Sequence, residues 1–474
     1  MNIHAANTTT ASLPTAPMSM RKVAIASSLG TTIEYYDFFI YATAAALVFP
    51  EVFFPALGPV GGTVASFATL SIAFVARPLG SIVFGHFGDR IGRKRSLVMT
   101  LLIMGIGTVL IGLLPGSDSI GVAAPIILVI LRAAQGFAVG GEWAGATLLT
   151  AEHSPIGKRG RYAVYPQLGA PLGYLFSAGA FLIVSTVFAG NDTFLDWGWR
   201  IPFVASLALI VLGLWVRLTV AETPAFTHAQ AVAAEDGEKR TAPFLQVIRH
   251  QSREVLLAAG GITMQYSFFY IGTAYLTSYA TSESGMGLSM NTVLVAGVIA
   301  SLILACTVIV AGRLSDRFGR RNTITVACVS GVVVAFALFP FLDLGGAFVF
   351  FLGLTAVLIV FGINFAPVGA FLPELFETRS RYTGAGLAFA LGGVIGGGVV
   401  PLLAPALDAR WGGIAVGGML VVTALFSLVC IRLLPETKNR DVISGAPHSA
   451  ATEQAAVDVA AATPAVIRAV GEEH

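Results

Sequence analysis

Long apolar segments constrain the fold of this chain more than any other feature of its sequence. A membrane-spanning helix needs about 20 mostly apolar residues, and the chain offers about twelve such segments. Only 11% of its 474 residues are charged, against about 25% in ordinary soluble domains. Because unpaired backbone groups are too costly in lipid, helix is the expected form of each span. The spans are expected at 23–48, 63–88, 96–114, 122–150, 163–189, 199–220, 254–280, 290–313, 322–342, 346–372, 382–406 and 411–434.

The distribution of lysines and arginines supports this assignment. If both tails lie on one side of the membrane, 24 of the 28 lysines and arginines fall on that side. Arg200 and Arg410 lie on the opposite side, and Arg77 and Arg132 lie within spans. The positive-inside rule then makes both termini cytoplasmic. The net charge of +2 is too small to indicate a nucleic-acid partner.

A polar connection divides the expected spans into two halves. Residues 221–253 form the longest polar stretch between spans, and their later part, Phe244 to His250, is typical of a short amphipathic helix. We therefore expect an N-terminal bundle at 21–220, a cytoplasmic loop at 221–253 and a C-terminal bundle at 254–436. The tails, 1–20 and 437–474, are polar or alanine-rich and are expected to be disordered.

Two motifs occur once in each half. GHFGDRIGRK (Gly85 to Lys94) follows the second span and recurs after the eighth as GRLSDRFGRR (Gly312 to Arg321). A weaker pair, EHSPIGKRGRY (Glu152 to Tyr162) and ELFETRSRY (Glu374 to Tyr382), follows the fourth and tenth spans. The repeats predict an all-α polytopic membrane protein with twelve transmembrane helices in two pseudo-symmetric six-helix bundles. Duplicated halves with a binding site between them are typical of transporters.

Two acids interrupt the first span. A charge at the centre of a bilayer costs about 2.5–3.5 kcal/mol, so Glu34 and Asp37 need either a partner or a function. Glu34 lies about 18 Å from the cytoplasmic end of its span, and Arg77 and Glu142 reach a similar depth on the second and fourth spans. The helical period also places Glu34, Asp37 and Tyr41 on one face of the first span.

The charges within the spans do not balance. Three acids, Glu34, Asp37 and Glu142, stand against two arginines, Arg77 and Arg132, so one added proton makes the set neutral. Proton relays are built from such interior ionisable residues. We therefore expect Glu34 and Asp37 to share a coupling proton, with Glu142 as a third proton-coupling acid. The alternative is that these groups form buried salt bridges that only fix helix packing.

Arg77 is the first candidate for binding a solute carboxylate, because a guanidinium binds carboxylates bidentately. Its competing role is counter-ion to Glu34 or Asp37. The second half has no charge at this depth, so its neutral polar side chains are expected to form the opposite wall of a cavity, or else to bond and pack between helices. The expected substrate-binding residues are Arg77, Arg132, Gln135, Tyr41, Gln265, Tyr266, Tyr270 and Asn364.

Several motifs resemble those of the major facilitator superfamily. The repeated G-x-x-x-D-R-x-G-R-[RK] motif is its most specific signature, R-x-x-Q-G (Arg132 to Gly136) is similar to its fourth-span motif, and PETK (Pro435 to Lys438) is similar to the sugar-porter ending. More narrowly, four segments resemble the metabolite:proton symporter family. They are IEYYDFF (Ile33 to Phe39), ARPLGSIVFGHFGDRIGRKR (Ala76 to Arg95), LRAAQGFAVGGEW (Leu131 to Trp143) and GWRIPF (Gly198 to Phe203).

The resemblance implies the major facilitator fold and proton-coupled uptake of a small carboxylate or zwitterion across the cell membrane by alternating access. Members carry solutes such as dicarboxylates, citrate, 2-oxoglutarate, shikimate, proline and betaine. The resemblance also implies a cytoplasmic gate of charged residues that pair across or within the halves. The alternative is a solvated basic face that only sets topology. The expected gate residues are Asp89, Arg93, Glu152, Arg159, Asp316, Arg320, Glu374 and Arg379.

Other functions are less well supported. No nucleophile lies beside a base in the spans, so neither enzymatic activity nor a cofactor is expected. Cys306, Cys328 and Cys430 lie in apolar segments without close spacing, which favours packing over a disulfide or a metal site. The expected partners are the solute, protons and the lipid bilayer, with the chain acting as a monomer. The alternatives are a proton-driven exporter of drugs or metabolites and a transporter-like solute sensor.

Overall fold

The regular structure of this protein is helical. The computed structural model describes residues 20–91, 93–140, 142–154, 157–188, 193–219, 243–377 and 381–438. Within these ranges no strand occurs. The fold is therefore a matter of how long helices pack against one another.

Six helical rods form the first half. In chain order they are α1 (Met20–Leu47), α3 (Gly58–Ile91), α4 (Arg93–Leu113), α6 (Ala123–Val139) with α7 (Glu142–His153), α8 (Arg159–Gln167) with α9 (Gly169–Val187), and η2 (Phe194–Gly198) with α10 (Arg200–Thr219). Short elements connect some of them, namely α2 (Phe49–Val52), η1 (Pro55–Leu57) and α5 (Ser117–Ile120).

Six further rods form the second half. They are α13 (Ser252–Tyr270) with η3 (Ile271–Tyr275) and α14 (Leu276–Thr281), α15 (Met290–Phe318), α16 (Arg320–Leu342), α17 (Ala347–Leu375), α18 (Arg381–Gly393) with η4 (Val394–Val399) and α19 (Val400–Trp411), and α20 (Gly413–Leu433). The short α12 (Pro243–His250) precedes them at the predicted position, with Val247 buried and the next three side chains exposed.

Each expected span coincides with one of these rods. Among the described residues, ten rods are long and apolar enough to cross a membrane. The other two are α1 and α4: Glu34 and Asp37 lower the apolar character of α1, and the apolar part of α4, Val98–Leu113, is shorter. Several helices run past the expected ends of the spans, so that α15 reaches Phe318.

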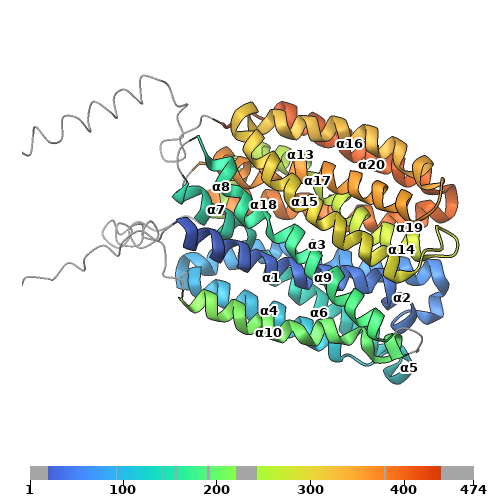
Figure 1. Cartoon of the computed structure of the whole chain (residues 1–474). Coiled ribbons are helices and arrows are strands. Elements are labelled where there is room, and N and C mark those ends of the chain that lie inside the picture. Colours follow the sequence, from blue (N-terminus) through green and yellow to red (C-terminus); the bar gives the residue numbers. More distant parts are fainter. Residues whose placement is uncertain are drawn as a thin grey trace, which may run out of the picture.

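The rods are arranged as two bundles that lie side by side. In Figure 1 the first bundle, coloured blue to green, lies below the second, coloured yellow to red, and the long helices of both run in roughly the same direction. The bundles meet through α3, α8 and α9 of the first and α15, α17 and α18 of the second. Hydrogen bonds cross this interface from Ser71 Oγ to the Gly398 carbonyl (2.7 Å) and from Ser185 Oγ to Asn291 Oδ1 (2.6 Å).

Glycines allow α3 and α6 to approach closely. A Cβ atom at Gly136 would collide with the backbone of Ala73, and one at Gly140 would collide with the backbone of Arg77. Small residues at helix contacts are the usual means of close packing in membranes. The contact holds the backbone of α3, which carries Arg77, directly against that of α6, which carries Arg132.

Two rods of the second bundle contain π-helical turns. The segment η3 interrupts the rod that begins with α13, and η4 interrupts the rod that begins with α18. Such wide turns are rare and occur frequently at functional sites. Both follow stretches of helix that face the first bundle, since α3 contacts α18 and η4, and α1 contacts η3.

The close contact between α3 and α6 yields a test of the packing. Gly136→Val should lower stability by about 1–3 kcal/mol, the usual effect of overpacking a tight contact, whereas Gly179→Val on α9 has open space around its Cβ position. The thermal unfolding midpoint of the purified variants measures the difference. If the two variants unfold at the same temperature, the close contact is not as described.

Candidate functional site

Ionisable side chains gather in the interior of the first bundle. Glu34, Asp37, Arg77, Arg132 and Glu142 are all buried, and Arg132 is only 1% exposed. They come from α1, α3, α6 and α7, so the similar depth expected from the sequence corresponds to one region of the structure. The region has two parts: one faces the second bundle and the other lies within the first.

The first part borders a small cavity between the bundles. Glu34, Arg77 and Trp143 line it from the first bundle, and Gly386 and Phe389 line it from the second. Its volume is about 10 Å³, about the minimum that holds one water molecule. The cavity is nearly closed, its walls come from both halves, and Glu34 and Arg77 are the charged side chains in a lining that is otherwise mostly apolar.

Aromatic rings surround Arg77 at this cavity. Its guanidinium carbon lies 4.3 Å from the centroid of the Phe38 ring and 4.4 Å from that of Phe74. The Tyr270 side chain of the second bundle lies next to the guanidinium. Arg77 Nε has no hydrogen-bond partner among the described residues. The arginine is thus held by ring faces and a phenol, with a donor left available.

The second part lies around Arg132. Its guanidinium carbon is 3.9 Å from the centroid of the Tyr41 ring and 4.5 Å from that of Phe38, so Phe38 contacts both buried arginines. Arg132 donates to Gln135 Oε1 at 3.1 Å, and Gln135 Nε2 donates to Thr108 Oγ1 at 2.7 Å. The rings shield both guanidiniums from lipid and keep their charge within the cluster.

Hydroxyl groups of α4 connect to the buried acids. Thr108 lies next to Asp37, and the charges of Arg132 and Glu142 act on that carboxyl group. Thr100 Oγ1 donates to Glu142 Oε1 at 2.8 Å. Sequence reasoning missed both threonines, although their eight-residue spacing on an otherwise apolar helix was a usable signal.

Not all of the substrate-binding residues expected in the second bundle lie near Arg77. Tyr266 and Tyr270 lie near Arg77, and the Tyr266 hydroxyl donates to the Phe389 carbonyl at 3.2 Å. Gln265 is buried, and its amide has no partner among the described residues. Asn364 Nδ2 instead faces two sulfur atoms inside the second bundle, which favours the packing interpretation for that residue.

A stacked aromatic pair closes one side of the cavity. The rings of Trp143 and Phe389, one from each bundle, lie parallel with centroids 3.7 Å apart. Trp143 Nε1 donates to Gln167 Oε1 at 3.3 Å, and Gln167 Nε2 donates to the Phe365 carbonyl at 2.7 Å. Sequence reasoning could not predict this stack, because its partners are 246 residues apart (389 − 143).

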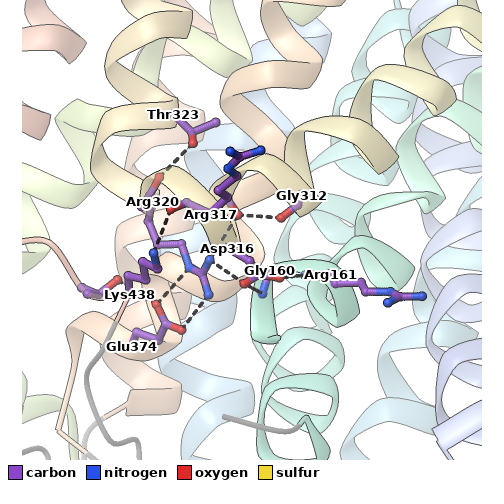
Figure 2. A network of polar contacts seen from close by, with 12 residues as sticks. Gly160, Arg161, Gly312, Asp316, Arg317, Arg320, Thr323, Glu374 and Lys438 are labelled. Atoms are coloured by element: carbon purple, nitrogen blue, oxygen red, sulfur yellow. Dashed lines mark hydrogen bonds and ion pairs between the residues drawn. The ribbon is translucent and has the colours of Figure 1, made fainter. Parts of the chain in front are cut away.

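Three of the expected gate residues, Asp316, Arg320 and Glu374, form a hydrogen-bonded network at one end of the interface (Figure 2), and a fourth acts on it electrostatically. Asp316 accepts hydrogen bonds of 2.8 Å from the backbone N–H groups of Gly160 and Arg161, across the boundary between the bundles. Arg320 bonds Asp316 at 2.7 Å and both oxygens of Glu374 at 3.4 Å. The fourth, Arg159, is buried and acts electrostatically on Glu374. The side chains of the other expected gate residues lie outside the described residues: Asp89, Arg93, Glu152 and Arg379.

The PETK motif has a specific structural role in this network. Glu436 accepts from the backbone N–H of Arg320 at 2.8 Å and from that of Arg321 at 3.1 Å. A carboxylate at a helix N-terminus satisfies unpaired donors and interacts favourably with the helix dipole. Thr437 Oγ1 donates to Glu374 Oε2 at 2.7 Å. The end of α20 is thus tied to the start of α16 and to α17.

The described residues contain no group of three or more His, Cys, Asp or Glu side chains placed to hold a metal ion. All three cysteines are free, with Cys328 and Cys430 buried as expected. Cys306 is exposed on α15 instead, because its side of the helix faces away from the bundle.

Comparison with known proteins agrees with this architecture. The model of the sugar (and other) transporter family matches residues 22–444. The chain is 42% identical to the inner membrane metabolite transport protein YhjE of Escherichia coli (strain K12) over 429 residues, which cover 90% of this chain and 96% of that protein. It is 38% identical to the shikimate transporter of the same organism over 396 residues, 83% of this chain and 89% of that protein.

Two further comparisons extend this result. The proline/betaine transporter of Escherichia coli (strain K12) is 32% identical over 443 residues, 92% of this chain and 87% of that protein. The solved structure of the xylose transporter XylE from E. coli, in a partially occluded inward-open conformation, matches with a TM-score of 0.68 at 18% identity, over 89% of this chain and 99% of that one. The chain belongs to the sugar (and other) transporter family, has the major facilitator fold, and is a membrane transporter of the metabolite-transporting group, not an enzyme.

Proposed function

We propose that this protein couples the uptake of a small carboxylate or zwitterion to the entry of protons. The observation that carries the proposal is the cavity between the bundles, where Glu34 and Arg77 of one half lie near Tyr266 and Tyr270 of the other. A solute bound there touches both bundles and is released when they part. The shikimate and proline/betaine transporters, by their names, carry solutes that contain a carboxylate.

Arg77 is the proposed anchor for the solute carboxylate. A guanidinium cannot lose its proton in a protein, and its forked donors match a carboxylate bidentately. The free Nε donor and the flanking faces of Phe38 and Phe74 support this role, since they leave the guanidinium charged without a dedicated ion pair in the described part of the chain. Gln265, with an unpaired buried amide, is the proposed polar contact from the second bundle.

Charge balance supports proton coupling. Three acids and two arginines share one desolvated region, and an uncompensated buried charge is strongly unfavourable. One proton on the acids makes the empty site neutral. Binding of a carboxylate at Arg77 adds a negative charge, so the loaded site is neutral only after a further proton enters. Solute and proton binding then favour each other.

The proposed proton route runs inside the first bundle, behind the solute cavity. Asp37 lies beside Thr108, and Asp37 Oδ1 has no hydrogen-bond partner among the described residues. Glu142 bonds Thr100, about two turns further along α4, toward the end where the gate residues lie. Phe38, which contacts Arg77 and Arg132, links this route to the solute site. The two cargoes therefore approach the same charge cluster from different sides.

Asp316 and the start of α8 form the proposed gate between the bundles. The Asp316 carboxylate bonds two backbone N–H groups of the first bundle, where a helix N-terminus favours negative charge. Arg320 holds Asp316 in place from its own bundle. We further propose that this end is cytoplasmic, that the protein acts as a monomer, and that it resides in the inner membrane, as the name of YhjE states for that protein.

Uptake into proteoliposomes tests the proposal. With an inwardly directed proton gradient, at least one member of a panel of labelled organic acids and betaines should accumulate above its external concentration. The same solute should only equilibrate when the gradient is collapsed. Gradient-independent accumulation, or outward pumping of apolar drugs in place of uptake, would count against the proposal.

Neutralising the acids should separate exchange from accumulation. Glu34→Gln and Asp37→Asn should each reduce gradient-driven accumulation about tenfold or more, because the coupling proton loses its acceptor. Exchange of internal for external solute needs no net proton movement and should persist. Glu51→Gln, at an exposed acid on α2, is the matched control. Full accumulation by both buried-acid variants would contradict the assignment.

Arg77→Lys distinguishes an anchor from a simple counter-charge. Lysine keeps the charge but cannot form the bidentate pair, so the apparent KM for the solute should rise about tenfold or more, equal to roughly 1.4 kcal/mol. Arg410→Lys, at the exposed outer end of α19, should leave KM unchanged. An unchanged KM in Arg77→Lys would assign Arg77 to charge balance alone.

Asp316→Asn should open the gate. The neutral amide offers a single acceptor oxygen for the two N–H groups at the start of α8, so the bundles should part more often at this end. Ala390→Cys, in the cavity wall, then reacts faster with a membrane-impermeant thiol reagent applied from that side, measured with Cys306→Ser in the background. Asp343→Asn, at an exposed acid near the other end of α16, serves as control. If Asp316→Asn and Asp343→Asn label at equal rates, the contact between Asp316 and the start of α8 is not a gate.

A further inference from the structure

A large groove lies away from the proposed transport site, on the outer surface of the second bundle. It has a volume of about 670 Å³ and is formed by α15, α16 and one residue of α17. Its apolar lining includes Cys306, Val310, Leu314, Phe318, Val326 and Ile363. On α15 these residues form one helical stripe, so the groove runs along the length of the helix.

Membrane lipid is the medium that suits the apolar part of this groove. Both α15 and α16 are long and apolar enough to cross a membrane. Val310 and Val326 are more than half exposed. The described chain places no segment over them, and hydrocarbon is the solvent for such a surface inside a bilayer. An elongated apolar groove of this size suits an acyl chain.

The groove has a polar, cationic end. Phe318 and Asn322 line it where α15 ends and α16 begins. The Arg317 guanidinium carbon lies 5.3 Å from the centroid of the Phe318 ring. No carboxylate of the described residues pairs with Arg317, and Figure 2 shows its side chain directed away from Glu374 and Asp316. An exposed arginine beside an apolar groove at a helix end is well placed to meet a phosphate.

We infer that this groove binds one anionic phospholipid, with an acyl chain along α15 and the phosphate at Arg317 and Asn322. The apolar stripe selects a lipid chain, and the unpaired guanidinium selects a negative headgroup over a zwitterionic one. The inference does not depend on the proposed transport function. It places the lipid phosphate at Arg317, the residue next to the gate residue Asp316. The backbone carbonyl of Arg317 also accepts a hydrogen bond from Lys438 Nζ (2.8 Å).

Native mass spectrometry of the purified full chain tests the headgroup. Phosphatidylglycerol should bind in preference to phosphatidylcholine of the same acyl chains, and Arg317→Gln should weaken phosphatidylglycerol binding about fivefold. Arg410→Gln is the matched control, because Arg410 also stacks on an adjacent aromatic ring, Trp411, at 5.2 Å but lies outside the groove. Equal binding of both lipids by the natural protein, or no effect of Arg317→Gln, would overturn the headgroup assignment.

Cys306 reports on the acyl chain in a second measurement. It is the exposed cysteine of the three and lies in the groove, so phosphatidylglycerol should slow its reaction with a maleimide in detergent. Val310→Trp fills the groove and should abolish both this protection and stoichiometric lipid binding. Val333→Trp, on an equally exposed part of α16 outside the groove, should abolish neither. Retained protection in Val310→Trp, or a second copy of the chain as the protecting partner, would refute the site.

Discussion

The structure depends on keeping charge neutral where nothing outside the protein can solvate it. Glu34, Asp37, Arg77, Arg132 and Glu142 are buried inside the first bundle, on helices that are expected to cross the membrane. An isolated charge there is costly, so the acids and the arginines must remain close together. The aromatic rings of Phe38, Phe74 and Tyr41 then cover the guanidiniums. The close packing of α3 against α6 through Gly136 serves this end, because these helices carry the two arginines.

The two bundles divide the work. The first contains the buried charges and the hydroxyl groups of α4, whereas the second faces it with tyrosines, Phe389 and the amide of Gln265. In the proposed mechanism, the first bundle balances the charge and the second fits the shape of the solute. π-Helical turns interrupt two rods of the second bundle, at η3 and η4, and a third, η2, precedes α10 in the first bundle.

Helix positions and depths could be predicted from sequence because they follow from local rules. Apolar length fixed the spans, and counting residues along each helix placed Glu34, Arg77 and Glu142 at one level. The partners of these groups could not be predicted, because they depend on how separate helices rotate against one another. The spacing of Thr100 and Thr108 could single out these two residues but not their partners, and the stack of Trp143 on Phe389 could not be predicted for the same reason.

Repeat motifs were informative about the gate but incomplete. They identified Asp316, Arg320 and Glu374, which do form a network. They could not show that Asp316 bonds backbone N–H groups of Gly160 and Arg161, since no side-chain pattern encodes that contact. Asn364 illustrates an alternative that sequence left open: an amide within a span can bind solute or bond between helices, and its Nδ2 faces Met264 and Cys328 inside its own bundle.

The central claim is that a carboxylate and a proton enter one buried charge cluster together. The most direct measurement is the proton uptake that accompanies binding of the transported acid to the purified protein in weakly buffered solution with a pH indicator. The account predicts uptake of close to one proton for each molecule bound, and its loss in Glu34→Gln or Asp37→Asn. Binding without any proton uptake in the natural protein would contradict it.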